Sequence, residues 1–262
     1  MAERYRSPYT IMSDPIEGLA RAALERVAAV RAVGGPWLVQ SDAETQLSIF
    51  CERLVDGDLI AAEATVRELS SRYESFEALA EELIAEASRR LGRMWDHDEI
   101  SFTEVSIGVS TLFHLATRMS VHSALASFGA QGNALFVTLD GQAHTLGIVL
   151  AAEAFRQHGW SVELRLGEDI DRALHVVATK KVLIVGLTCS QADQRNDVAR
   201  FVAEARSIQP GANILLGGTL VSAEPERAEA LGADRLVSSL AGALNEAERV
   251  RTAQPILPHG PN

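Results

Sequence analysis

The segment at residues 134–160, ALFVTLDGQAHTLGIVLAAEAFRQHGW, decides the fold that we predict for this chain. It begins with an apolar run typical of a buried strand and ends with an apolar, helix-forming stretch. The short loop between them contains one histidine, His144. In proteins built from strands that alternate with helices, ligands bind at the carboxyl ends of the strands, and His144 follows such an end.

The C-terminal half of the chain repeats this alternation of strand and helix. After the apolar run at 134–139, further strands are predicted at 161–166, 181–188, 212–218 and 234–239. Helical segments separate them, so the pattern predicts an α/β domain over 132–252 with a five-stranded, doubly wound parallel sheet of the flavodoxin type. In that topology the loop after the first strand meets the loop after the third.

The pattern over residues 41–128 is helical throughout and predicts a four-helix bundle. Ser75 and Ser101 are the expected N-caps of the last two helices, and Glu104 completes a capping box with Ser101. The last helix is expected to bury the apolar residues Phe102, Val105, Val109, Leu112, Phe113, Ala116 and Met119. Residues 1–40 are predicted to be an arm or linker, and 253–262 a tail.

Composition excludes several classes of function. The net charge of −11 argues against direct nucleic-acid binding, which needs clustered Lys and Arg to neutralise phosphates. No stretch approaches the roughly 20 apolar residues of a membrane span, and the first residues lack a signal-peptide layout. The two cysteines, Cys51 and Cys189, match no zinc-site spacing, so we expect a reduced, cytoplasmic protein.

The loop around His144 lacks the motifs of the commonest α/β ligands. Gly141 and Gly147 do not make a G-x-G-x-x-G fingerprint, and Ile148 stands where a phosphate-binding P-loop would need lysine. No aspartate ends the third strand, as a receiver domain would require, and Ser190 has no G-x-S-x-G around it. A histidine near a helix start suits a metal-bearing cofactor with cobalt or iron. The alternative is a histidine that caps the next helix.

The stretch GQAHTLG resembles the D-x-H-x-x-G loop of cobalamin-binding domains, in which a histidine replaces the cofactor's own benzimidazole on cobalt. The stretch 188–190 stands where that family has S-x-L or S-x-T, and Gly217 and Gly218 match its double glycine beside the nucleotide tail. The helical region resembles the cap that these proteins place over the upper face of the corrin. The resemblance covers about residues 42–250.

The resemblance implies that His144 is the metal ligand on the lower face of the cofactor and that residues of the cap lie near its upper face. No catalytic residue is implied. The expected cofactor-binding residues are Gly141, Gln142, His144, Thr145, Leu146, Gly147, Leu187, Thr188, Ser190, Gly217, Gly218, Ser238, Trp95 and Val105.

Two longer stretches, LGRMWDHDEISFTEVSIGVSTL and LDGQAHTLGI, resemble the AerR/PpaA group of cobalamin-binding antirepressors. That resemblance implies a light-linked transcription regulator, not an enzyme, which binds a repressor of the CrtJ/PpsR type and relieves repression of photosynthesis genes. The cofactor would be cobalamin in its hydroxo, methyl or adenosyl form. Neither DNA nor a membrane is an expected partner, and the sequence indicates no particular oligomeric state.

The chain departs from the family pattern at two positions. Gln142 stands where an acidic residue is usual, and a neutral amide can orient the imidazole but adds no charge, so we expect a weaker bond to cobalt. Glu104-Val105 stands where light-sensing relatives that bind DNA have Glu-His, and valine cannot ligate cobalt. A corrinoid methyl-carrier subunit of a methyltransferase system is one alternative function. A haem-binding sensor is the other, because one histidine also suits iron.

Overall fold

The computed structural model of the protein describes residues 40–124, 132–142, 144–190 and 193–253. The predicted arm, apart from Gln40, and the predicted tail, apart from Ala253, lie outside these residues. Within the described residues, no helix combines the length and the apolar character that a membrane span requires.

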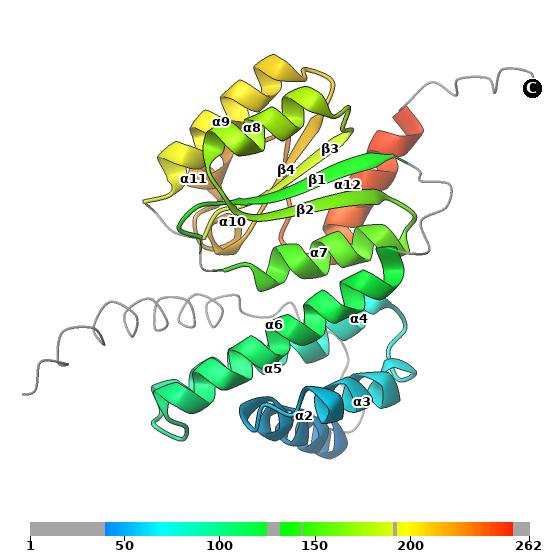
Figure 1. Ribbon diagram of the computed structural model, residues 1–262, viewed down its shortest axis with the longest axis vertical. Helices are drawn as coiled ribbons and strands as arrows, with labels where there is room; N and C mark the ends of the chain where they lie inside the picture. Colours follow the sequence, from blue (N-terminus) through cyan, green and yellow to red (C-terminus); the bar gives the residue numbers. More distant parts are fainter. Residues whose placement is uncertain (1–39, 125–131, 143, 191–192, 254–262) are drawn as a thin grey trace, which may run out of the picture.

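The first part of the described chain is helical. Its elements are α2 (Gln40–Val55), α3 (Leu59–Ser70), α4 (Phe76–Leu79), the π-helix η1 (Ala80–Ile84), α5 (Ala85–Asp96) and α6 (Phe102–Ala124). Because α4, η1 and α5 follow one another without a break, they form one rod, which we call the α4–α5 rod. The predicted helical bundle is therefore confirmed as a cap of four helical rods (Figure 1).

Local hydrogen bonds explain where these helices begin. The Oγ of Ser75 accepts the N–H of Ala78 at 3.2 Å, as predicted for an N-cap. The N–H of Ser101 donates to Oε2 of Glu104 at 2.7 Å, and the N–H of Glu104 donates to Oγ of Ser101 at 3.3 Å. The predicted capping box is thus confirmed.

The second part is a five-stranded parallel sheet with strand order β2-β1-β3-β4-β5, the flavodoxin-type order that the sequence predicts. Its strands are β1 (Asn133–Leu139), β2 (Ser161–Glu168), β3 (Ile184–Thr188), β4 (Asn213–Gly217) and β5 (Arg235–Leu236). The last strand is shorter than predicted because, among the described residues, it pairs only with β4 and only at two positions.

Helices cover both faces of the sheet (Figure 1). Because side chains alternate along a strand, Leu135 and Val137 of β1 face one layer while Ala134 and Phe136 face the other. The first layer contains α8 (Ile170–Thr179), α9 (Arg195–Ile208), α10 (Thr219–Ala223) and α11 (Pro225–Glu229). The second contains α7 (Leu146–Gln157) and α12 (Leu240–Ala253).

Helix α7 joins the cap to the sheet. Its residues Ile148, Ala152 and Phe155 pack on the sheet, whereas Val149 and Leu150 belong to the core of the cap. Figure 1 shows α7 between the sheet and α6. The cap therefore sits directly on the α/β domain through a shared helix.

The buried stripe of α6 differs from the predicted one. Val105, Leu112 and Ala116 are buried as expected, but Phe102 and Val109 are 36% and 38% exposed. Part of the predicted face is therefore buried, and α5 approaches the helix beside it at a glycine. A Cβ added to Gly108 would lie only 3.1 Å from Leu91 Cδ1. The buried face is centred nearer Gly108 than predicted, and Phe102 and Val109 lie at its exposed edge.

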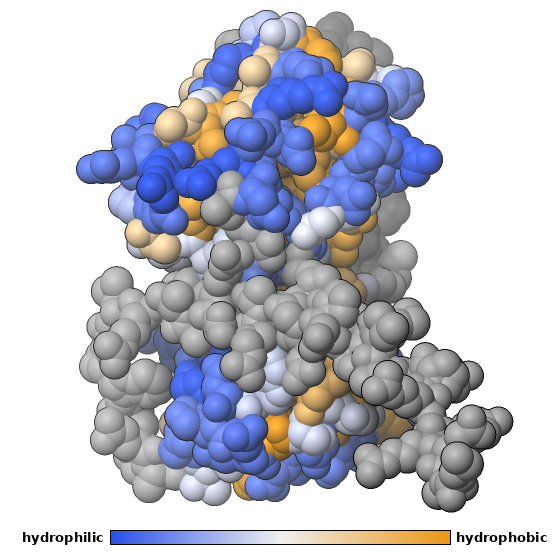
Figure 2. Space-filling view, turned by 90° about the vertical axis from the view of Figure 1, so that its left-hand side faces the viewer, coloured by the Kyte–Doolittle hydropathy of each residue, from blue (hydrophilic) through white to orange (hydrophobic). Residues whose placement is uncertain are grey.

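The acidic composition predicts a largely hydrophilic surface, and the sequence predicts reduced cysteines. Figure 2 shows mostly hydrophilic residues over the described parts of the α/β domain and the cap on that side, with small hydrophobic areas between them. Cys51 and Cys189 are both buried, and the two are not joined by a disulfide. Burial disfavours the thiolate and raises the pKa of Cys51 to about 12, so this thiol is unreactive near neutral pH.

Candidate functional site

The loops after β1 and β3 meet at the carboxyl edge of the sheet, as predicted. The Nε2 of Gln142 donates to the backbone oxygen of Thr188 at 2.7 Å, and Oγ1 of Thr188 donates to Oε1 of Gln142 at 2.9 Å. Gln142 is only 9% exposed. The Gln142 amide therefore joins the histidine loop to the end of β3.

The amide of a second glutamine also bonds to this loop. Gln194, which precedes α9 and is 8% exposed, donates from Nε2 to the backbone oxygen of Gly141 at 2.7 Å. Gly141 has φ of +76°, a conformation that glycine adopts readily. Our sequence reasoning missed Gln194. The signal was its place as a polar residue at the end of the loop predicted to face Gly141.

His144 lies between this clamped loop and α7. Its side chain is partly buried, and its Nε2 atom is shielded from solvent. The N-cap position of α7 belongs to the next residue, Thr145, and not to His144. A Cβ added to Gly147 would meet nothing within 4 Å, so space is open beside the first turn of the helix. This arrangement fits a bulky group held by an imidazole nitrogen.

The side chains near His144 also fit a metal whose other ligands belong to its cofactor. Among the described residues, no group of three or more His, Cys, Asp and Glu side chains could hold a metal ion. A single imidazole at the end of a strand suits a metal carried inside a macrocycle. Such a metal would receive one ligand from the protein, and His144 is the residue placed to provide it.

The double glycine after β4 packs against the loop after β3. Gly218 has φ of +101°, and a Cβ added there would lie 2.6 Å from the backbone oxygen of Cys189. The N–H of Cys189 donates to the oxygen of Gly217 at 3.0 Å, and the N–H of Leu220 donates to the oxygen of Cys189 at 3.1 Å. Backbone packing therefore accounts for Gly218, and its expected role beside a nucleotide tail stays a prediction.

The remaining predicted residues divide between the edge of the sheet and the cap. Ser190 lies at the edge, where its backbone oxygen accepts from Thr219 Oγ1 at 3.2 Å, and Ser238 is exposed after β5. Leu187 is buried in the core of the sheet. Thr145 and Leu146 are partly buried at the start of α7.

The two predicted cap residues, Trp95 and Val105, are 6% and 1% exposed in the core of the cap. The structure therefore does not bring them to the surface of the cap. The ring of Phe102 lies beside Trp95, with 6.4 Å between the ring centroids, and is more exposed. Sequence reasoning placed Phe102 in the core, so it missed the aromatic side chain that this part of the cap presents.

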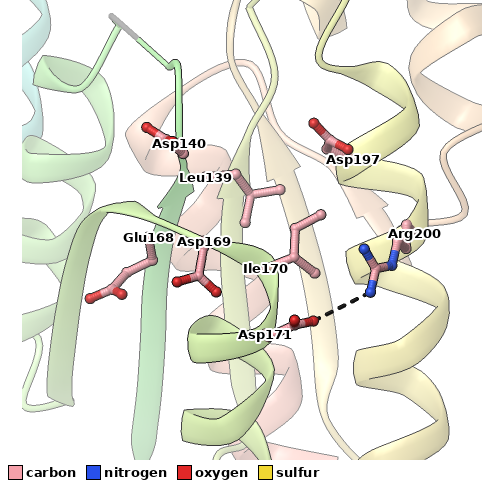
Figure 3. A pocket seen from close by; sticks show the side chains of 8 residues that line it. All are labelled: Leu139, Asp140, Glu168, Asp169, Ile170, Asp171, Asp197 and Arg200. Atoms are coloured by element: carbon pink, nitrogen blue, oxygen red, sulfur yellow. Dashed lines mark hydrogen bonds and ion pairs between the residues drawn. The ribbon is translucent and has the colours of Figure 1, made fainter.

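A hollow of about 260 Å³ lies at the same edge, between β1, α8 and α9 (Figure 3). Figure 3 shows the Arg200 guanidinium turned toward Asp171, which lies 3.3 Å away. The hollow is lined by Leu139, Asp140, Glu168, Asp169, Ile170, Asp171, Asp197 and Arg200. Its carboxylates outnumber its single guanidinium, so it disfavours a phosphate-bearing group, and we do not assign it to the cofactor.

The bond between Thr188 and Gln142 makes a testable contribution to stability. Thr188→Val removes the hydroxyl and leaves a buried amide oxygen short of a donor, so we expect a loss of about 1–2 kcal/mol in the free energy of unfolding. Urea denaturation measures it. Thr188→Ser keeps the hydroxyl and should lose much less. Equal losses in the two variants would mean that the methyl group, and not the hydroxyl, matters.

The fold and the site together define a class: a flavodoxin-like α/β domain under a helical cap, with a histidine loop that faces open space. A comparison with known protein families agrees with this class. Residues 132–247 match the model of the B12 binding domain family. The predicted cobalamin-binding fold is confirmed, and the comparisons support a corrinoid as the ligand.

Two individual proteins are similar over most of the chain. The "Uncharacterized 20.5 kDa protein in bchF-crtJ intergenic region" of Rhodobacter capsulatus is 28% identical over 182 residues, which are 68% of this chain and 95% of that protein. The monomethylamine corrinoid protein of Methanosarcina barkeri superposes with a TM-score of 0.62 at 13% identity, over 79% of this chain and 99% of that one. At that identity the second likeness concerns the fold alone.

Proposed function

We propose that this protein is a cobalamin-binding, light-linked antirepressor that acts in the cytoplasm by binding a repressor of the CrtJ/PpsR type. The relative from Rhodobacter capsulatus carries the proposal, because its name places it between bchF and crtJ and the match spans 95% of its length. The net charge of −11 supports a protein partner in preference to DNA.

The chemistry of the loop supports a sensor over a methyl carrier. Repeated methyl transfer is expected to depend on tuning of the cobalt through the histidine and an acidic partner. In this chain the corresponding residue is neutral, and both polar atoms of the Gln142 side chain bond to Thr188. A ligand set without a carboxylate favours a cofactor that stays bound and changes state.

The residues of the chain have distinct roles in this proposal. His144 holds the metal, while Gln142 and Gln194 hold the loop that carries it. Alkylcobalamin, when bound, supplies a cobalt–carbon bond that visible light can break. The cap rests on α7, the helix that starts beside His144, so a change at the loop alters how the cap packs. The repressor would recognise that altered surface.

The decisive experiment loads the purified protein with hydroxo-, methyl- or adenosylcobalamin, in darkness and after illumination. Each form is then added to a CrtJ/PpsR-type repressor bound to its operator DNA, and release of the DNA is measured. We expect the protein to release the DNA from the repressor in one cofactor state. Without a cofactor it should not release the DNA. His144→Ala is the negative control. Release that is the same with and without cobalamin would contradict a cobalamin-dependent switch.

The corrinoid methyl carrier is the second candidate, and the fold likeness to a corrinoid protein favours it. Transfer of a methyl group from the bound cofactor to a methyltransferase substrate, without an effect on the repressor, would establish it instead. A haem sensor would be indicated if protein from haem-replete cells shows a Soret band and retains none of the three cobalamins.

A further inference from the structure

One contact joins the cap to the start of the last helix of the α/β domain. Glu81, in the π-helix η1, accepts the backbone N–H of Leu240 at its Oε1 with a distance of 2.6 Å. Leu240 is the first residue of α12 and lies 159 positions away in the sequence. Its side chain also packs against the core of the cap. The start of α12 is thus docked on the cap by both backbone and side chain.

The electrostatics of a helix start make this contact strong. The first N–H groups of a helix have no acceptor within the helix, and a carboxylate there also interacts favourably with the helix dipole. In α12 two side chains accept such N–H groups. Ser239 accepts the N–H of Gly242 at 3.0 Å, and Glu81 accepts that of Leu240. The acceptor for Leu240 therefore stays in place only while the cap stays in place.

A second residue of the rod lies close to the α/β domain. Glu77 lies four residues before Glu81 on the α4–α5 rod, and its Oε1 is 3.5 Å from Nδ1 of His158, at the end of α7. The rod is also locally widened, because the N–H of Ala85 bonds to the oxygen of Ala80 in a π turn. Such turns occur frequently at functional sites. The rod therefore contacts the ends of two helices of the α/β domain.

We propose that Glu81 is a positioning residue that latches the cap to α12 and couples the carboxyl edge of the sheet to the position of the cap. The inference rests on the proposed function, because Ser238, an expected cofactor-binding residue, lies two positions before Leu240. A ligand that shifts Ser238 moves the N–H that Glu81 holds. Displacement of the cap, in turn, leaves that N–H without its acceptor.

The latch is tested in the cofactor-free protein by hydrogen–deuterium exchange at the amide of Leu240. In Glu81→Ala we expect exchange there to rise about tenfold, because a charge-assisted hydrogen bond is lost. Glu81→Gln keeps an acceptor oxygen but loses the charge, so the rise should be clearly smaller than in Glu81→Ala. Glu82→Ala, at the exposed neighbouring position, is the matched control and should change nothing.

Unchanged exchange in Glu81→Ala, or an equal rise in Glu82→Ala, would overturn the latch. If Glu81→Ala does not fold, Glu81→Asp is measured in its place. The aspartate side chain is shorter by one methylene group, so we expect its carboxylate not to reach the N–H of Leu240. The same rise of about tenfold is then expected, and exchange as in the wild type overturns the proposal.

A second measurement concerns the site itself. With hydroxocobalamin bound, the rate at which added cyanide replaces the upper ligand is followed by absorbance. A loosened cap exposes that face, so the rate should rise in Glu81→Ala, rise less in Glu81→Gln and stay unchanged in Glu82→Ala. Equal rates in all variants would contradict the coupling. Failure of the wild type to retain cobalamin would overturn the proposed function and leave the exchange result at Leu240 standing.

Discussion

Replacement of His144 by alanine is expected to weaken cobalamin binding by at least about 100-fold, because even the outer partners of a metal ligand contribute 10- to 100-fold. The side chain is partly buried at the start of α7, beside the open space at Gly147. The retained cofactor should also lose the absorbance spectrum of a histidine ligand. Gel filtration followed by absorbance spectroscopy measures both effects.

A matched control separates loss of the ligand from general damage. His175 is exposed on α8, on the opposite layer of the sheet, and His175→Ala should bind cobalamin as the wild type does. If His144→Ala retains the cofactor with an unchanged spectrum, His144 is not the axial ligand. The open space beside Gly147 would then accommodate a cofactor that keeps its own benzimidazole on cobalt.

Gly218→Ala should lower the free energy of unfolding by about 3 kcal/mol, the largest loss of stability that we expect from one added methyl group. Gly218 has φ of +101° and ψ of 175°, a region that is almost restricted to glycine, and strain there costs about 1–3 kcal/mol. The new Cβ would also lie 2.6 Å from a backbone oxygen, which cannot move as a flexible side chain can. Urea denaturation measures the change.

Gly211→Ala is the control for this substitution, because a Cβ at Gly211 would meet nothing within 4 Å. We expect it to change the free energy of unfolding by less than about 1 kcal/mol. A similarly small effect at Gly218 would contradict the close packing of the loops after β3 and β4. It would mean that the loop containing Cys189 can move away from Gly218 without cost.

Much of the fold could be read from local patterns. The alternation of apolar runs and helical segments predicts the parallel sheet, and the order of its strands follows the flavodoxin topology. Ser75, Ser101 and Glu104 cap helices where the sequence places them, because a cap involves groups only three residues apart. His144 stands at the carboxyl end of β1 for a similarly local reason.

The limits of such reading appear in α6 and in the cap. The spacing of apolar residues places Phe102 and Val109 on the buried stripe, yet both are more than a third exposed. Other residues of the same stripe, such as Val105 and Leu112, are buried, and Leu91 approaches the helix closely at Gly108, to one side of that stripe. Periodicity identifies the helix, but it does not say which neighbour comes closest.

The sequence by itself determined the class of the fold, the helix starts and the place of the candidate metal ligand, because each depends on residues that are near one another in the chain. The tertiary structure alone decided how the histidine loop is held. Gln142 meets Thr188 across 46 positions, Gln194 meets Gly141 across 53, and Glu81 meets Leu240 across 159. These partners are brought together by strand order and by the packing of α7 against the cap, and no local pattern records them.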